Sequence, residues 1–128
     1  MIDTNVLVSM IFFPSEHMNR VKRKICDNHS IVLCSHIIEE LQDVVTRKFP
    51  AKSKALDTFL ESLPYELVYT PKYFDASKYP QVRDKKDTPI LVTAILEDID
   101  ILLSGDDDFS PVVIERPDIL SPSMFLRK

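Results

Sequence analysis

Short apolar runs alternate along this chain with segments in which apolar residues recur at helical spacing. Helical spacing places apolar side chains on one face of a helix, whereas short continuous apolar runs are typical of buried strands. Strands that alternate with helices predict an α/β fold. We expect a three-layer α/β/α sandwich around a mostly parallel sheet of about five strands.

The pattern also predicts where the elements lie. Strands are expected at Ile2 and at residues 31–34, 66–70, 101–103 and one of 112–114 and 119–120. Helices are expected after Ser15, over 36–48 with Ser35 as its cap, over 51–63, from Thr88-Pro89 and from Ser121-Pro122, because Ser and Pro favour the first positions of helices. The strand at Ile2 is very short, so either it is truncated or the natural chain begins upstream.

Size and composition narrow the class of protein. The 128 residues fit a single domain, residues 1–128, with a core of its own. No apolar run reaches the length of about 18 residues that spans a membrane, and no signal peptide is apparent. The two cysteines form no metal-binding pattern, which favours a reducing, cytoplasmic location. A net charge of −4 argues against a protein that coats nucleic acid.

The candidate chemistry lies in the acids that follow predicted strands. The strand at 101–103 runs into Ser104, a glycine and three consecutive aspartates, and Asp3 follows the first strand. Ligands of parallel sheets bind beyond the carboxyl ends of the strands. Asp106 and Asp108 are therefore expected to help hold a divalent cation there, since hard cations prefer carboxylate oxygens. The spacing does not fit a calcium loop of the EF-hand type, and Mg²⁺ or Mn²⁺ is the better match.

Two further candidate acids, Glu40 and Asp87, lie within or just before predicted helices. At about 100° per residue, Glu39 points away from the buried stripe of its helix, whereas Glu40 lies at the border of that stripe. Asp87 directly precedes the helix that begins at Thr88.

Each acid also has a simpler interpretation. Asp3 could form a turn after its strand, and Glu40 could be a solvated helix residue. Asp87 could cap its helix, and Asp108 could cap a following turn. Turns, caps and solvated positions explain each acid separately, but they explain less well why all of these acids occur together in one chain.

Four segments together resemble the motifs of PIN-domain nucleases. They are Ile2-Asp3-Thr4-Asn5-Val6-Leu7-Val8-Ser9, Ser35-His36-Ile37-Ile38-Glu39-Glu40-Leu41, Asp87-Thr88-Pro89-Ile90-Leu91 and Leu103-Ser104-Gly105-Asp106-Asp107-Asp108-Phe109. They occur in the order that this family has. The closing segment, residues 119–126, resembles the toxin-like branch of the family in prokaryotic toxin–antitoxin pairs.

The resemblance implies a role for each motif residue. Asp3, Glu40, Asp87 and Asp106 would be the catalytic, metal-binding acids, and Asp108 an additional metal-site acid. Asn5 and Ser104 would orient Asp3 and Asp106, while Asp107 would be solvated. The implied activity is Mg²⁺- or Mn²⁺-dependent hydrolysis of RNA that leaves a 5′-phosphate and a 3′-hydroxyl. The implied partners are an RNA substrate, an antitoxin protein and a second copy in a homodimer.

Other functions remain open at this point. The domain could be a catalytically silent relative that binds an antitoxin or RNA. A receiver-type signalling domain also gathers acids at strand ends, but the predicted strand 66–70 has no phosphoacceptor aspartate. Arg83, Lys85 and Lys86 beside Asp87 are candidates for RNA contacts, although basic residues are more often simply solvated.

Overall fold

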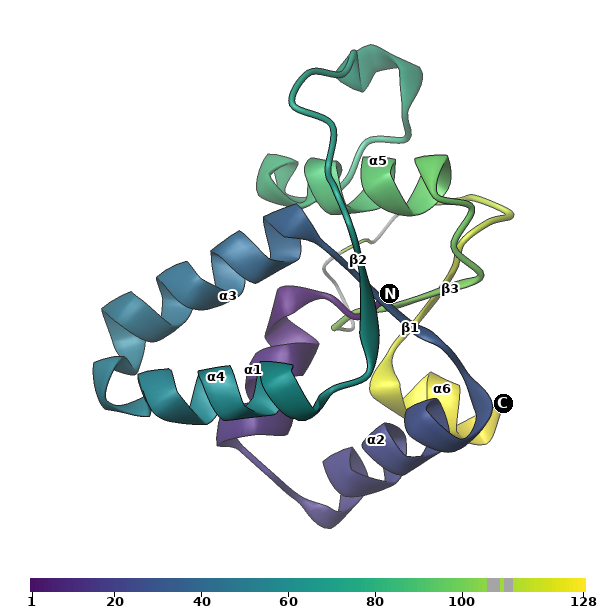
Figure 1. Ribbon diagram of the computed structural model, residues 1–128. Coiled ribbons are helices and arrows are strands. Elements are labelled where there is room, and N and C mark those ends of the chain that lie inside the picture. The colour runs from purple at the N-terminus through teal and green to yellow at the C-terminus, as the bar shows by residue number, and fades with distance from the viewer. Residues whose placement is uncertain (106–108, 110–111) are drawn as a thin grey trace.

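The computed structural model describes residues 1–105, 109 and 112–128 of the protein (Figure 1). Its helices are α1 (Thr4–Phe12), α2 (Glu16–Asn28), α3 (Ser35–Lys48), α4 (Ser53–Ser62), α5 (Thr88–Leu96) and α6 (Pro122–Arg127). Its strands are β1 (Ile31–Cys34), β2 (Tyr65–Val68), β3 (Ile101–Leu103) and β4 (Asp118–Leu120). Single 3₁₀ turns occur at Pro50–Lys52, Ala76–Lys78 and Lys85–Asp87. Strands and helices alternate over much of the chain, which confirms the α/β class.

The strands form two small parallel sheets. β1 pairs with β2, with Ile31 opposite Tyr65, and β3 pairs with β4, with Ile101 opposite Asp118. Ile2 adds an isolated parallel bridge to Leu103. The predicted sheet of about five strands is not found among the described residues. The paired segments are only three or four residues long, and Ile2 contributes one bridge instead of a strand that would join the two sheets.

Most helices begin and pack as the apolar pattern predicts. The Ser15 side chain accepts a hydrogen bond from the backbone N–H of Met18 and caps α2, and Ser121 caps α6 through Met124 in the same way. In α2, the buried residues are Met18, Val21 and Ile25, which recur at helical spacing. These helices were predictable because the capping serine and the spacing of the apolar residues indicate the same helix.

The predicted cap of α3 is wrong. Ser35 is the first residue of the helix, and the cap position falls on Cys34 without a side-chain hydrogen bond. The Ser35 hydroxyl instead accepts a hydrogen bond of 2.9 Å from the backbone N–H of Thr70, just beyond β2. A contact between segments far apart in sequence therefore replaces the local cap.

The core lies where the helices cover the strands. α5 is buried along most of its length, from Ile90 to Ala94, as its almost continuous apolar sequence predicts. Figure 1 shows α5 on one side of the strands and α2 with α6 on the opposite side. Helices α1, α3 and α4 lie together on another side of the strands. The fully buried side chains come from several of these elements and include Leu7, Leu33, Ile37, Leu41, Leu91 and Leu102.

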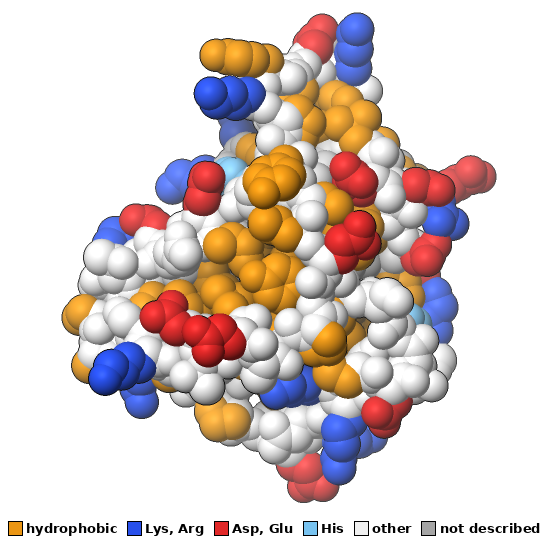
Figure 2. Space-filling view, viewed as in Figure 1, with side chains coloured by type: hydrophobic (Ala, Val, Ile, Leu, Met, Phe, Trp, Pro, Cys, Tyr) orange, Lys and Arg blue, Asp and Glu red, His pale blue; other side chains and the backbone are white. Residues whose placement is uncertain are grey.

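The face in Figure 2 carries hydrophobic side chains at its centre, over β2, with charged side chains mostly around them. Leu67 within β2 and Tyr69 just after it are exposed. Within the described residues, no helix combines the length and the apolar character that a bilayer crossing requires.

Candidate metal and nucleic-acid site

Asp3 is buried and is held by both backbone and side-chain hydrogen bonds. Its backbone N–H donates to the carbonyl oxygen of Leu103 at 2.9 Å, which ties it to the end of β3. The residue is 4% exposed, with Oδ1 accepting from the Val6 N–H at 3.1 Å and Oδ2 accepting from the Ser104 hydroxyl at 2.6 Å. Asp3 thus caps α1, whereas its simpler interpretation was a turn after a strand.

Ser104 was predicted, with Asn5, to orient Asp3 and Asp106, and its hydroxyl donates to Asp3. The hydroxyl is completely buried, and the backbone N–H of Ser104 donates to the carbonyl oxygen of Leu120 at 3.0 Å. Ser104 is therefore held by β4 while it holds Asp3. Asp106 and Asp108, the acids that follow it, lie outside the described residues.

Glu40 is held by the residue next to Asp3. The Thr4 hydroxyl donates a hydrogen bond of 2.9 Å to Oε1 of Glu40, which links the first turn of α1 to α3. His36, one helical turn before Glu40, places Nε2 at 3.6 Å from the same oxygen. Glu39 is exposed whereas Glu40 is half-buried, which confirms the prediction from helical periodicity.

Glu40 and Asp87 line the same open pocket, of about 790 Å³. We name it the mixed-charge pocket, and its lining residues are Asn5, Glu40, Arg83, Asp84, Lys85, Lys86 and Asp87. Asp87 stands at the cap position of α5, but its side chain makes no capping hydrogen bond there. The capping interpretation of Asp87 is therefore wrong. The nearby Asp84 side chain instead accepts from the Lys86 N–H at 3.0 Å and orders the 3₁₀ turn before the helix.

Three cations share this pocket with the acids. Arg83, Lys85 and Lys86 are exposed, and they lie on the segment that leads into α5. The amino ends of α1 and α5 reach the pocket as well, through Asn5 and Asp87. Positive side chains and helix amino ends both favour the binding of phosphate.

The donors suit a hard divalent cation, because Asp3, Glu40 and Asp87 offer carboxylate oxygens. Within residues 1–105, 109 and 112–128, however, no three acids, histidines or cysteines are grouped closely enough for a metal site. Asn5, Glu40 and Asp87 line one pocket. Asp3 lies next to this pocket in sequence, because the adjacent Thr4 donates a hydrogen bond to Glu40.

Two residues near the site were not singled out from the sequence. Thr4 contacts Glu40, and Asp84 orders the basic turn. Asp84 is detectable as an Asp that precedes a short turn by two residues. No sequence pattern indicates the role of Thr4, because its hydrogen bond to Glu40 depends on how α1 packs against α3.

Fold and site together define an α/β domain in which Asp3 follows the parallel bridge of Ile2 to β3, while Glu40 and Asp87 line one pocket. A family model described as PIN domain matches residues 1–108, which include every predicted acid of the site. The chain belongs to the PIN-domain family. Comparisons with curated proteins and with solved structures give no significant match.

Membership of this family supports a function. PIN domains are generally nucleases and typically use divalent metal ions, which supports a hydrolase acting on nucleic acids.

Proposed function

We propose that the protein is a Mg²⁺- or Mn²⁺-dependent endoribonuclease. The observation that carries this proposal is the mixed-charge pocket, where Glu40 and Asp87 face the same space as Arg83, Lys85 and Lys86. Acids alone would repel a phosphodiester, and cations alone would bind it without activating water. A pocket with both kinds of charge suits a site that holds a metal ion and a phosphate side by side.

In this proposal Asp3, Glu40, Asp87 and Asp106 hold the metal, and Asp108 assists them. When bound, Mg²⁺ or Mn²⁺ would lower the pKa of a coordinated water and stabilise negative charge on the scissile phosphate. The Ser104 hydroxyl fixes Oδ2 of Asp3, and the Thr4 hydroxyl fixes Oε1 of Glu40. Each hydrogen bond restrains the rotation of one carboxylate, so its oxygens keep a constant direction.

The proposed substrate is RNA, attacked in line by water to leave a 5′-phosphate and a 3′-hydroxyl. Arg83, Lys85 and Lys86 would bind backbone phosphates close to the cleavage point, since all three side chains are exposed at the pocket. Asn5, also exposed, would donate a hydrogen bond to a substrate oxygen or orient Asp3.

The biological role that we propose is that of the toxin in a toxin–antitoxin pair, acting in the cytoplasm as a homodimer. Support comes from the resemblance of residues 119–126 to the closing segment of toxin-like PIN domains. A small gene directly adjacent, encoding a protein that binds this chain and suppresses its activity, would be the expected partner. A neighbouring gene product that neither binds nor inhibits would contradict this role.

The nuclease proposal is tested with single-stranded RNA and Mn²⁺, using Asp106→Asn and its matched neighbour Asp107→Asn. We expect the original chain and Asp107→Asn to cleave RNA, and Asp106→Asn and chelated samples to be inactive. Single-stranded DNA of the same sequence, run in parallel, tests the preference for RNA. Cleavage that survives both Asp106→Asn and chelation would overturn the proposal. RNA binding without cleavage by the original chain would show a catalytically silent binding module instead.

A further inference from the structure

The segment between β2 and α5, residues 69–86, projects from the molecule, and we name it the β2–α5 arm. Figure 1 shows it extending past α5, away from the other elements. It carries three of the chain's four tyrosines, Tyr69, Tyr73 and Tyr79, together with five cations and two acids. The arm therefore has a net charge of +3, in a chain whose net charge is −4.

Both ends of the arm are fixed beside the mixed-charge pocket. At its first end the Thr70 N–H donates to the Ser35 hydroxyl at 2.9 Å, and the Thr93 hydroxyl donates to that of Thr70 at 3.1 Å. These hydrogen bonds attach the arm to α5 and to the start of α3, the helix that carries Glu40. At its other end the arm runs through Arg83 into the lining of the pocket.

Contacts within the arm hold its shape. The rings of Phe74 and Tyr79 pack edge to face, with their centroids 6.3 Å apart. The Asp75 side chain accepts hydrogen bonds from the N–H of Ser77 at 3.0 Å and from its hydroxyl at 2.6 Å, and it caps the turn Ala76–Lys78. An arm that is already ordered loses less conformational freedom when it binds a ligand.

Two tyrosines of the arm face solvent. Tyr69 is 75% exposed and Tyr73 is 89% exposed, whereas Phe74 and Tyr79, which pack against each other, are half-buried. A ring with so little buried surface contributes little to the stability of the fold. It is available for binding, and every nucleic-acid base has a flat face that stacks on such a ring.

The charges of the arm complement a nucleic-acid backbone. Lys72 and Lys78 are exposed on either side of Tyr73 in the sequence. The two acids, Asp75 and Asp84, instead accept hydrogen bonds from the backbone of their own turns. Figure 2 shows that the projecting part of the molecule carries both hydrophobic and basic side chains. Aromatic rings interleaved with cations are the combination that binds single-stranded nucleic acid.

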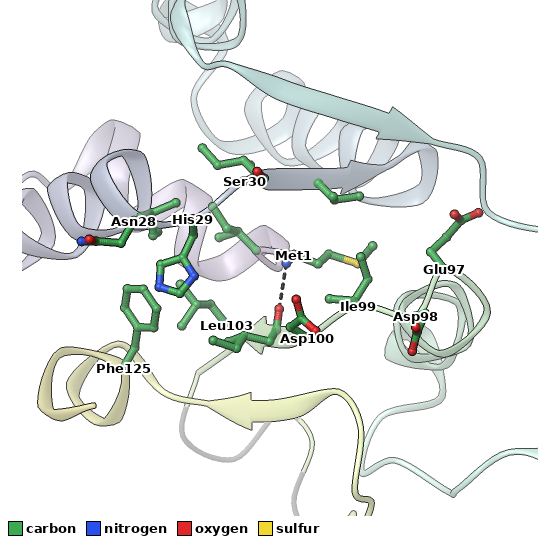
Figure 3. Close-up of a pocket in the computed structure, with 15 residues that line it drawn as sticks. Met1, Asn28, His29, Ser30, Glu97, Asp98, Ile99, Asp100, Leu103 and Phe125 are labelled. Carbon is green, nitrogen blue, oxygen red and sulfur yellow. Dashed lines mark hydrogen bonds between the residues drawn. The ribbon is translucent and has the colours of Figure 1, made fainter.

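A cavity elsewhere in the molecule suits RNA less well (Figure 3). It has a volume of about 400 Å³, and Met1 lines it and donates from its amino group to the Ile101 carbonyl oxygen at 2.8 Å. Glu97, Asp98 and Asp100 line it too, and among the described residues no lysine or arginine does so. A lining of this charge disfavours a phosphate backbone. Charge therefore favours an RNA path that leads from the mixed-charge pocket along the arm.

We propose that the β2–α5 arm binds unpaired bases of the RNA substrate. Tyr69 and Tyr73 are the rings on which the bases stack, and Lys72 and Lys78 contact the phosphates between them. This inference rests on the proposed nuclease function, because it extends the RNA path away from the mixed-charge pocket. The bases of a double helix are stacked on one another and do not reach such rings. The substrate class is therefore RNA that is single-stranded beside the cleavage point.

The test measures the binding of a labelled single-stranded RNA of about 12 nucleotides by fluorescence anisotropy, in the Asp106→Asn chain so that the RNA stays intact. We expect Tyr69→Ala and Tyr73→Ala each to weaken binding about fivefold or more, the lower end of what one stacked base contributes. Tyr73→Phe keeps the ring and should bind like its parent. The matched control is Phe13→Ala, an aromatic residue that is 60% exposed at the carboxyl end of α1 and should not weaken binding.

A second measurement reports the stacking itself. The chain contains no tryptophan, so Tyr73→Trp introduces a single indole whose fluorescence is excited selectively. We expect single-stranded RNA to quench this fluorescence and a duplex of the same sequence to quench it much less. A substitution that acted only through the fold would weaken binding without this difference between the two RNAs.

Two results would overturn the proposal. Tyrosine variants that bind RNA as tightly as Phe13→Ala, with no quenching in Tyr73→Trp, would show that the arm does not contact RNA. Self-association of the parent chain that Tyr73→Ala abolishes, with RNA binding unchanged, would assign the arm to a second copy instead.

The cleavage assay separates this inference from the proposed function. Cleavage by the original chain together with RNA binding that does not depend on the tyrosines would contradict the role of the arm alone. Binding that depends on the tyrosines, without cleavage by the original chain, would contradict the nuclease proposal alone.

Discussion

The hydroxyl of Ser104 donates a hydrogen bond of 2.6 Å to Oδ2 of Asp3, across 101 positions of sequence. Both side chains are buried, and the acceptor is a carboxylate. Hydrogen bonds to charged groups are among the stronger ones, and the loss of one leaves a buried carboxylate short of a donor. This contact joins the start of the chain to the end of β3 and determines how Asp3 is oriented.

Replacement of Ser104 by Ala should therefore reduce both stability and activity. We expect the free energy of unfolding to fall by roughly 2 kcal/mol, measured by urea denaturation. The matched control is Ser123→Ala, an exposed serine of α6, which should change stability by less than about 0.5 kcal/mol. Equal stability of the two variants would mean that the Ser104–Asp3 hydrogen bond does not hold this part of the fold.

The hydrogen bond from Thr4 to Glu40 gives a prediction about activity. Thr4→Val keeps the shape of the side chain but removes the donor, so the carboxylate of Glu40 loses its restraint. We expect RNA cleavage in Mn²⁺ to fall by about 10- to 100-fold, the usual range for residues that orient metal ligands. Thr4→Ser, which keeps the hydroxyl, should retain most of the activity. If Thr4→Val and Thr4→Ser cleave equally well, the hydroxyl has no role in positioning Glu40.

The cations of the mixed-charge pocket give a prediction about salt dependence. Lys85→Gln combined with Lys86→Gln should weaken RNA binding, measured at several salt concentrations with a catalytically inactive variant as background. Each lost phosphate contact should reduce the slope of log K against log salt by about 0.7 for a single strand. The control pair is Lys52→Gln with Lys54→Gln, two exposed lysines that do not line the pocket. An identical slope in both double variants would place the RNA elsewhere.

The sequence predicted those helices for which the capping residue and the apolar spacing indicate the same element. For α2, the Ser15 cap and the spacing of Met18 and Val21 point to the same helix, and the structure has it. The border position of Glu40 followed from helical geometry alone. These features depend on residues close in sequence, where pattern and structure are directly linked.

Features that depend on distant contacts were missed or misassigned. The Ser35 hydroxyl bonds to Thr70 instead of capping α3, and the hydrogen bond from the Ser104 hydroxyl to Asp3 spans 101 positions. No local pattern distinguishes a serine that caps its own helix from one that bonds to another segment. The single sheet of about five strands is not found among the described residues for a related reason, since pairing between short segments is decided by packing and not by propensity.

The central claim is that acids from four separate segments bind one catalytic metal site. It is tested most directly by Mn²⁺ binding, measured by electron paramagnetic resonance on the original chain, Glu40→Gln, Asp87→Asn and Asp106→Asn. The matched controls are Glu39→Gln and Asp107→Asn, and thermal melting checks that every variant folds. We predict that each of the three site substitutions weakens Mn²⁺ binding at least tenfold, while both controls bind like the original chain. Site variants that fold and bind Mn²⁺ as tightly as the controls would contradict the account.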